Sequence, residues 1–134
     1  MIKELMIDGI KYSIRRPTII IIDGEECVGS CNASMSQISI SKRCGKGAEV
    51  VTLVHEIVHA ILIGKNFSKE NSNEELVDSL AMSIVNLIRL NPHLIKFIID
   101  EGEIDYGDYT NLVRITMEEI ENMQDVNNAD IEVD

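Results

Sequence analysis

The chain has 134 residues, of which 45% are hydrophobic and only 4% are aromatic, so it is expected to fold as one domain around an aliphatic core. The net charge of −11 is concentrated in residues 100–134, which hold twelve acidic residues and one Arg. Such a surface repels phosphate backbones, so we expect no direct nucleic-acid binding. No apolar run approaches the ~20 residues of a membrane span and the N-terminus lacks a signal-peptide pattern, so we expect a cytoplasmic protein without membrane contact.

Residues 3–45 have the pattern of short strands. The segments 3–7 and 10–15 flank Asp8-Gly9, which is a strong hairpin signal. The β-branched run 18–22 predicts a central strand that is buried on both faces. Asp23-Gly24 predicts a second turn.

Two further short strands are expected at residues 27–31 and 36–41. In the second, Ile38 and Ile40 are predicted to face inward. The polar side chains that alternate with them are expected to face outward, namely Gln37, Ser39 and Ser41.

The period then changes to that of helices. A helix is predicted at about 48–63, with Gly64 as the residue that ends it, and a polar loop follows at 65–71. Three more helices are predicted at about 73–90, 92–100 and 109–123.

The segment His55-Glu56-Ile57-Val58-His59 lies in the predicted helix 48–63. Histidines four residues apart share one helix face, so both imidazoles can reach one ion, and Glu56 projects at a different angle where it can hold a water. The flanking residues are apolar almost all round, which predicts a buried helix whose polar side chains need partners. This HExxH arrangement indicates a zinc site rather than hydrogen-bonded core histidines.

A catalytic zinc needs a third protein ligand and keeps its fourth position for water. His93 stands at a predicted helix start and is read as exposed or structural. At about 100° per residue, Glu74 lies about 60° from the centre of the apolar face of helix 73–90, whereas Glu75 lies about 160° away. Ser72 and Glu75 also form an S-x-x-E capping box, which engages Glu75 and leaves Glu74 as the predicted ligand.

Asp78 follows Glu74 by one helical turn on the same flank. A carboxylate there can accept the second N–H of a zinc-bound imidazole, which fixes its tautomer. The alternative is an ordinary charged first turn that favours the helix dipole.

HExxH followed by a helix bearing Asn73-Glu74-x-x-x-Asp78 resembles the gluzincin metallopeptidases. The short chain, the fifteen residues from His59 to Glu74 and the run Asp78-Ser79-Leu80-Ala81 resemble more closely the ImmA/IrrE-type metallopeptidases, above all their small phage and prophage zincin-like members. Those proteins follow the ligand helix with Asn-Pro and a short apolar helix, as residues 91–98 do here. The resemblance covers about residues 10–100.

The resemblance implies one zinc ion held by His55, His59 and Glu74, with Glu56 as the catalytic base. It also implies that an edge strand above the helix takes up an extended protein or peptide substrate through backbone hydrogen bonds. We assign that role to the strand 36–41, with Gln37, Ser39 and Ser41 as the substrate-binding residues. Relatives of this kind are thought to cleave regulatory proteins, so a transcriptional regulator is an expected substrate.

The predicted fold is α+β, a minimal zincin-like domain over residues 1–124 with an acidic tail at 125–134. A small twisted sheet of four to five strands packs on the HExxH helix and is followed by two to three helices. The alternative function is a non-catalytic phage or prophage interaction protein with a structural or vestigial zinc site. A fourth ligand from Cys27, Cys31 or Cys44 would indicate that alternative, although free thiols are the expected state of these cysteines because their count is odd.

Overall fold

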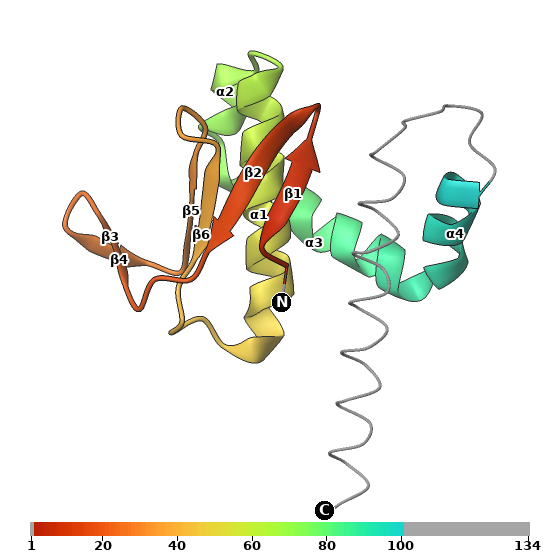
Figure 1. Ribbon diagram of the computed structural model, residues 1–134, viewed down its shortest axis with the longest axis horizontal. Coiled ribbons are helices and arrows are strands. Elements are labelled where there is room, and N and C mark those ends of the chain that lie inside the picture. The colour runs from red at the N-terminus through yellow and green to blue at the C-terminus, as the bar shows by residue number, and fades with distance from the viewer. Residues whose placement is uncertain (1, 101–134) are drawn as a thin grey trace, which may run out of the picture. The chain divides into compact units, whose positions relative to one another are not determined.

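The computed structural model describes residues 2–100, and residues Lys3–Leu94 form one compact unit. This unit has an α+β fold with a four-stranded mixed sheet of order β1-β2-β6-β5 and a separate two-stranded sheet of β3 and β4 (Figure 1). The described elements are β1 (Glu4–Ile7), β2 (Ile10–Arg15), β3 (Ile20–Ile22), β4 (Glu25–Cys27), β5 (Gly29–Asn32), β6 (Gln37–Ile40), α1 (Lys46–Gly64), α2 (Ser68–Asn71), α3 (Glu74–Leu90) and α4 (Pro92–Asp100). The predicted helix 109–123, the tail 125–134 and the proposed domain end at 124 lie outside the described residues.

The first hairpin forms as predicted. Strands β1 and β2 pair antiparallel, with Ile7 opposite Ile10. Asp8 and Gly9 connect them with φ of 48° and 82°, the left-handed backbone that a two-residue hairpin turn requires. The inward side chains of this hairpin, Ile7 and Tyr12, enter the core.

The strand predicted at 18–22 is not central, and that expectation is wrong. Only residues 20–22 form a strand, β3, and it pairs with β4 alone through the Asp23-Gly24 turn. Ile21 is 56% exposed, and only Ile20 of the run is buried. Figure 1 shows this hairpin extending away from the four-stranded sheet. A β-branched run indicates a strand, but its neighbours in space decide whether that strand is covered.

Strand β6 lies inside the sheet rather than at its edge, which corrects the expectation for residues 36–41. It pairs parallel with β2 on one side and antiparallel with β5 on the other. Its inward alternation is as predicted, since Ile38 and Ile40 are fully buried. The strand at the edge beside β6 is β5.

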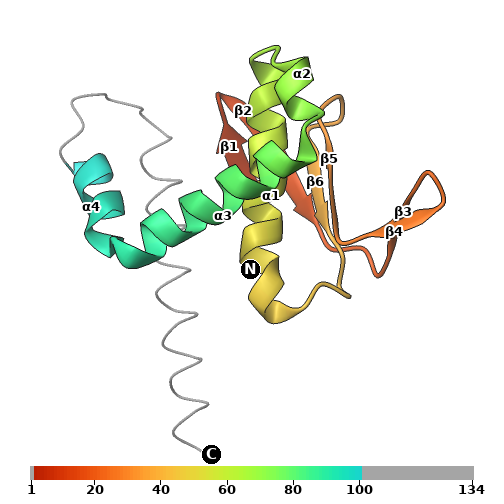
Figure 2. The ribbon, with the colours of Figure 1, turned by 180° about the vertical axis from the view of Figure 1, so that it is seen from behind.

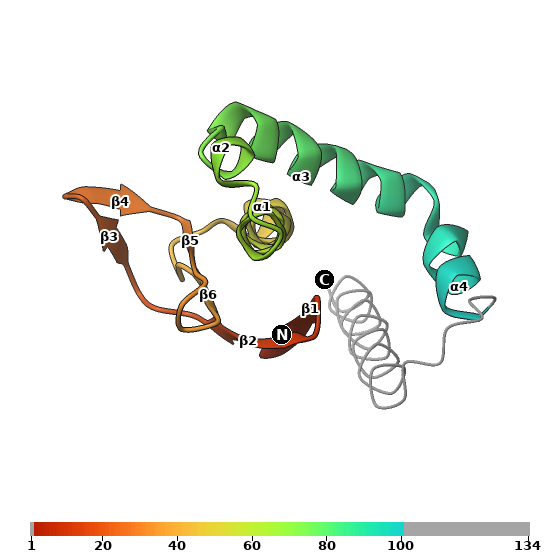
Figure 3. The ribbon, with the colours of Figure 1, turned by 90° about the horizontal axis from the view of Figure 1, so that it is seen from above.

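Helix α1 lies between the four-stranded sheet and α3, as the view from above shows (Figure 3). One face contributes Ala60 to the core, and Leu53, Ile57 and Ile61 pack beside it. The helix is less buried than its apolar sequence predicts, because Val50 remains 43% exposed.

Helix α1 ends one residue later than predicted. Gly64 is its last helical residue, and the left-handed position is taken by Asn66 with φ of 63°. The amide of Asn66 donates to Ile63 O at 3.1 Å and the amide of Phe67 donates to Leu62 O at 2.9 Å. These two bonds satisfy the last carbonyls of the helix in the pattern of a Schellman cap.

Helix α3 crosses α1 on the side facing away from the sheet, in front of α1 in Figure 2, and begins at Glu74. Its N-cap is Asn73, whose Oδ1 accepts from the amide of Leu76 at 3.1 Å. The predicted Ser72–Glu75 capping box is therefore wrong, since the Ser72 hydroxyl donates instead to Ser68 O within the short helix α2. Asparagine is as good an N-cap as serine, so local sequence did not separate the two.

By length and composition alone, α1 is long and apolar enough to cross a membrane, with a mean hydropathy of 1.5. Helices α3 and α4 meet the same criterion only when they are taken together as one bent segment. From the sequence we expected no apolar run near the ~20 residues of a membrane span, and α1, with 19 residues, comes close to that length. A core helix of a soluble protein passes the same test, and α1 packs against both the sheet and α3.

Candidate metal centre

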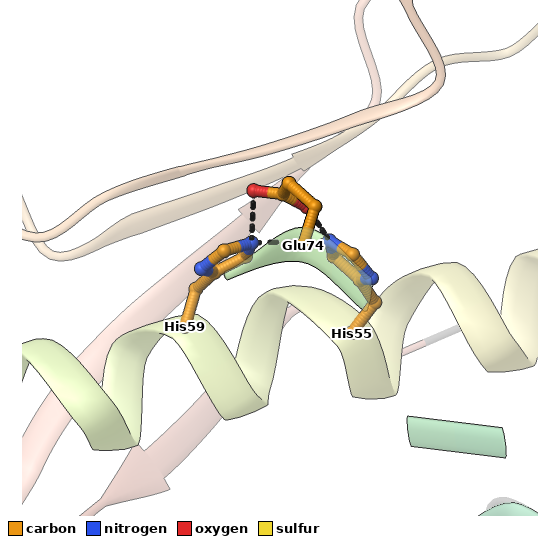
Figure 4. A group of neighbouring side chains, drawn as sticks. All are labelled: His55, His59 and Glu74. Atoms are coloured by element: carbon orange, nitrogen blue, oxygen red, sulfur yellow. Dashed lines mark hydrogen bonds and ion pairs between the residues drawn. The ribbon is translucent and has the colours of Figure 1, made fainter. Parts of the chain in front are cut away.

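Three side chains from two helices converge on one point (Figure 4). His55 and His59 come from α1, and their Nε2 atoms are 3.1 Å apart. Glu74, the first residue of α3, places Oε2 3.1 Å from His55 Nε2 and Oε1 3.2 Å from His59 Nε2. The structure thus brings together the three residues that the sequence predicts as metal ligands.

The arrangement follows from local structure. The spacing of four residues sets both imidazoles on the same face of α1. The packing of α3 against α1, together with the Asn73 cap, brings the first turn of α3 opposite that face. Glu74 therefore reaches the histidines from a rigid helix start rather than from a loop.

The donor set fits a zinc ion. Zinc bonds of about 2.0–2.1 Å at tetrahedral angles place neighbouring ligand atoms roughly 3.3 Å apart, close to the separations seen here. Two imidazole lone pairs and a carboxylate that face each other at 3.1–3.2 Å repel unless a cation or shared protons lie between them. Two histidines and one carboxylate are also a ligand set of catalytic zinc sites.

The Nδ1 atom of each imidazole, which points away from the ligand group, has a hydrogen-bond partner. His55 Nδ1 lies 2.7 Å from Asp78 Oδ1, and His59 Nδ1 lies 2.7 Å from Asn71 Oδ1. An Nδ1–H that donates to each of these oxygens leaves the Nε2 lone pair free for a metal. Asp78 thus occupies the place predicted for it, whereas Asn71 was not predicted.

Glu56 lies beside the ligand group without belonging to it. It projects from α1 under β5 and is only 6% exposed. Burial raises the pKa of its carboxyl group; the nearby His55 and His59 oppose that rise, and the charges of Glu74 and Asp78 add to it. The Glu56 side chain lines the same groove as the histidines. A water bound at the metal point, by which we mean the space between the ligand atoms of His55, His59 and Glu74, would therefore have a carboxylate next to it.

A groove of about 760 Å³ surrounds the ligand group. Helix α1 forms its floor, and the start of α3 with Asn71 and Ser72 forms one wall. The other wall comes from the β3–β4 hairpin and the edge strand β5, through Ile22, Cys27 and residues 29–31. The metal point is therefore open to a chain that runs along β5.

The residues predicted to bind substrate, Gln37, Ser39 and Ser41, do not line this groove. Ser41 is fully buried, and its hydroxyl donates to Thr18 O at 3.2 Å. Gln37 and Ser39 lie on the interior strand β6, which has no free edge. Residues Gly29, Ser30 and Cys31 of the edge strand β5 line the groove instead.

The three cysteines are free thiols. Cys27 and Cys31 line the groove, and Cys44 is buried with its sulfur 3.5 Å from Thr52 Oγ1. Burial, and then the charge of Glu56, raise the pKa of Cys31 to about 11. Within residues 2–100, the group that can hold a metal contains the two histidines and Glu74 and no cysteine.

Two residues of the site had no signal in the sequence. Asn71 lies in a segment predicted as a loop, and Gly29 lies in a strand whose edge position depends on the whole sheet. Only the fold brings Asn71 to His59 and Gly29 to Glu56. In comparisons with known proteins, no family model, no curated protein and no solved structure matches this chain.

Proposed function

We propose that this protein is a cytoplasmic zinc-dependent metallopeptidase of the zincin-like, ImmA/IrrE type. The observation that carries the proposal is the convergence of three ligand atoms beside a buried glutamate in an open groove. A structural zinc site would have a fourth protein ligand. The described residues contribute no cysteine to the group, which favours a catalytic site with a position left for water.

His55, His59 and Glu74 would hold the zinc ion. When bound, zinc supplies a Lewis acid and lowers the pKa of its water to about 7. Glu56 accepts the proton of the attacking water and delivers it to the nitrogen of the scissile peptide bond. Asp78 and Asn71 hold the imidazoles in the orientation and tautomer that ligation needs.

The substrate is proposed to be a protein segment in extended form, lying antiparallel or parallel to the free edge of β5. Edge strands offer unpaired backbone N–H and C=O groups that pair with such a segment. A regulatory protein such as a transcriptional regulator, of the kind that phage and prophage relatives act on, is the substrate class that we propose.

Glu56→Gln tests this function. The variant should bind zinc with the wild-type stoichiometry of one ion, because Glu56 is not a ligand, and should lose about 10²–10⁴-fold in turnover because a general base is removed. Zinc content is measured by metal analysis, and turnover by cleavage of fluorescein-labelled casein, an unfolded probe. Undiminished cleavage by zinc-loaded Glu56→Gln protein contradicts the assignment.

His55→Ala is the matched control on the same helix. It should lose the bound zinc and the activity together, since it removes a ligand rather than the base. A His55→Ala protein that retains one tightly bound zinc ion contradicts the ligand set.

A further inference from the structure

Gly29, the first residue of the edge strand β5, lies directly against the Glu56 side chain. A Cβ atom placed on Gly29 would lie 2.7 Å from Thr52 Cγ2, 2.8 Å from Glu56 Oε1 and 3.2 Å from Glu56 Cγ. Real Cβ atoms essentially never come within 3.0 Å of another atom. The backbone of β5 therefore approaches Glu56 as closely as only a glycine permits.

The β5 backbone, Thr52 and Glu56 would all be affected by a Cβ atom at position 29, and they differ in how readily they can move. Strand β5 is held in the sheet, since Gly29 pairs with Ile40 and the amide of Ser41 donates to Val28 O at 2.8 Å. Thr52 is β-branched, so on a helix its side chain is restricted to two χ1 rotamers. The Glu56 carboxylate is the end of a flexible side chain, so it is the group that a methyl at position 29 would displace first.

We propose that Gly29 is a positioning residue, which acts through Glu56 by leaving space for its carboxylate beside the histidine pair. The inference rests on the proposed function for the role of Glu56 as base, but the contact itself does not. Glu56 lines the groove that holds the histidine pair, and its Oε1 lies where a Cβ at position 29 would collide with it. The lack of a side chain at Gly29 thus keeps open the position that the Glu56 carboxylate occupies.

The first test needs neither metal nor substrate. Gly29→Ala is compared with Gly47→Ala, a matched control because a Cβ at Gly47 meets nothing within 4 Å. In NMR spectra of the metal-free proteins, we expect Gly29→Ala to move the side-chain carbon resonances of Glu56 and to leave the amides of the β5–β6 ladder in place. Gly47→Ala should move neither set. Displaced ladder amides with an unmoved Glu56 side chain would overturn the proposal.

The second test separates positioning from stability. Thr52→Ser removes the methyl group that lies nearest to a Cβ at position 29, and it keeps the hydroxyl near Cys44. Gly29→Ala/Thr52→Ser should therefore recover the urea midpoint lost in Gly29→Ala while the Glu56 resonances stay displaced. Recovery of both together would assign the effect to Thr52 packing and overturn the role of Glu56.

The third test uses zinc-loaded protein and labelled casein. Gly29→Ala should lose about a hundredfold in kcat, the scale of an ångström of misplacement, with unchanged KM and zinc affinity. In the Glu56→Gln background the same substitution should cause no further loss, because it acts through the side chain already altered. Additive losses would overturn the proposal, whereas a wild type without activity would count against the proposed function and leave the metal-free result to decide the role of Gly29.

Discussion

The two histidines of the site differ in the partner of their Nδ1 atom. His55 faces the carboxylate of Asp78, and His59 faces the neutral amide of Asn71, each at 2.7 Å. A carboxylate acceptor makes its imidazole more electron-rich than an amide acceptor does, so the two ligands are not equivalent. Both partners nevertheless perform the same geometric task, which is to hold Nε2 toward Glu74.

Asn71→Leu should weaken zinc binding about 10–100-fold, the usual effect of removing the hydrogen-bond partner of a ligating histidine. Asn71→Asp keeps an acceptor and should bind zinc at least as tightly as the wild type. Competition with a chromophoric chelator measures the affinities. The control is Asn91→Leu at the opposite end of α3, where the Asn91 side chain donates to Leu87 O. Equal affinity of Asn71→Leu and wild type would exclude a role for Asn71.

Cys31 should react slowly with iodoacetamide near neutral pH. Its pKa is raised from 9.0 to about 11, chiefly by burial, and the thiolate is the reactive form. At pH 8 the rate should be about a hundredfold below that of the same thiol in the unfolded protein, and it should keep rising up to about pH 11. Peptide mass spectrometry follows the alkylation, and a plateau near pH 9 would contradict the raised pKa.

The raised pKa of Cys31 also makes the free energy of unfolding depend on pH. A raised pKa means that the fold favours the neutral thiol, so the contribution is fully present below pH 9.0 and is lost as the pH rises through about 11. Cys31→Ala should abolish this part of the alkaline loss in urea unfolding followed from pH 8 to 11.

At the scale of elements, the start of α3 decides where the third ligand lies. The Asn73 cap begins the helix at Glu74, so the ligand is fixed by helical geometry from its first residue. The apolar patterns predicted α3 and α4 with their bounds within one residue. The cap was missed because Ser72 and Asn73 are both good cap residues and only the backbone path between α2 and α3 distinguishes them.

Asn73→Ala should lower the free energy of unfolding by about 1 kcal/mol, since one amide at the helix start loses its acceptor. Ser72→Ala is the matched control and should have a smaller effect, because its hydroxyl donates to Ser68 O rather than capping α3. Urea unfolding of metal-free protein measures both. A larger loss in Ser72→Ala would restore the capping box that the sequence predicts.

At the scale of the whole unit, the ligand group joins α1 to α3, two helices that also pack together and share the contact between His55 and Asp78. His55 and His59 belong to the central helix, and Glu74 belongs to a helix on the side of α1 that faces away from the sheet (Figure 3). An ion bound by all three would cross-link α1 to α3. Because the unfolded chain does not hold these residues together, the binding free energy adds to the stability of the fold.

Zinc should therefore raise the thermal stability of the protein. Free zinc at 1,000 times its Kd contributes about 4 kcal/mol, which corresponds to an increase in Tm on the order of 20 °C for a unit of this size. Removal of zinc with EDTA should reverse the increase, and His55→Ala should show no response to either. Differential scanning calorimetry measures the shifts, and a wild-type Tm that does not depend on zinc would count against the site.

The sequence by itself determined the features that depend on short stretches of chain. The Asp8-Gly9 hairpin, the inward alternation of β6 and the shared face of the histidine pair all follow from periods of two or 3.6 residues. The choice of Glu74 over Glu75 followed from the same helical period, although the capping argument beside it was wrong.

The tertiary structure alone decided which strand lies at the edge of the sheet and what covers each face. It placed β6 inside the sheet and β5 at its edge, left most of β3 exposed, and brought Asn71 to His59 and Gly29 to Glu56. These outcomes depend on pairings between residues far apart in the chain. Hydrophobic periodicity shows that a face must be covered but carries no information on which segment covers it.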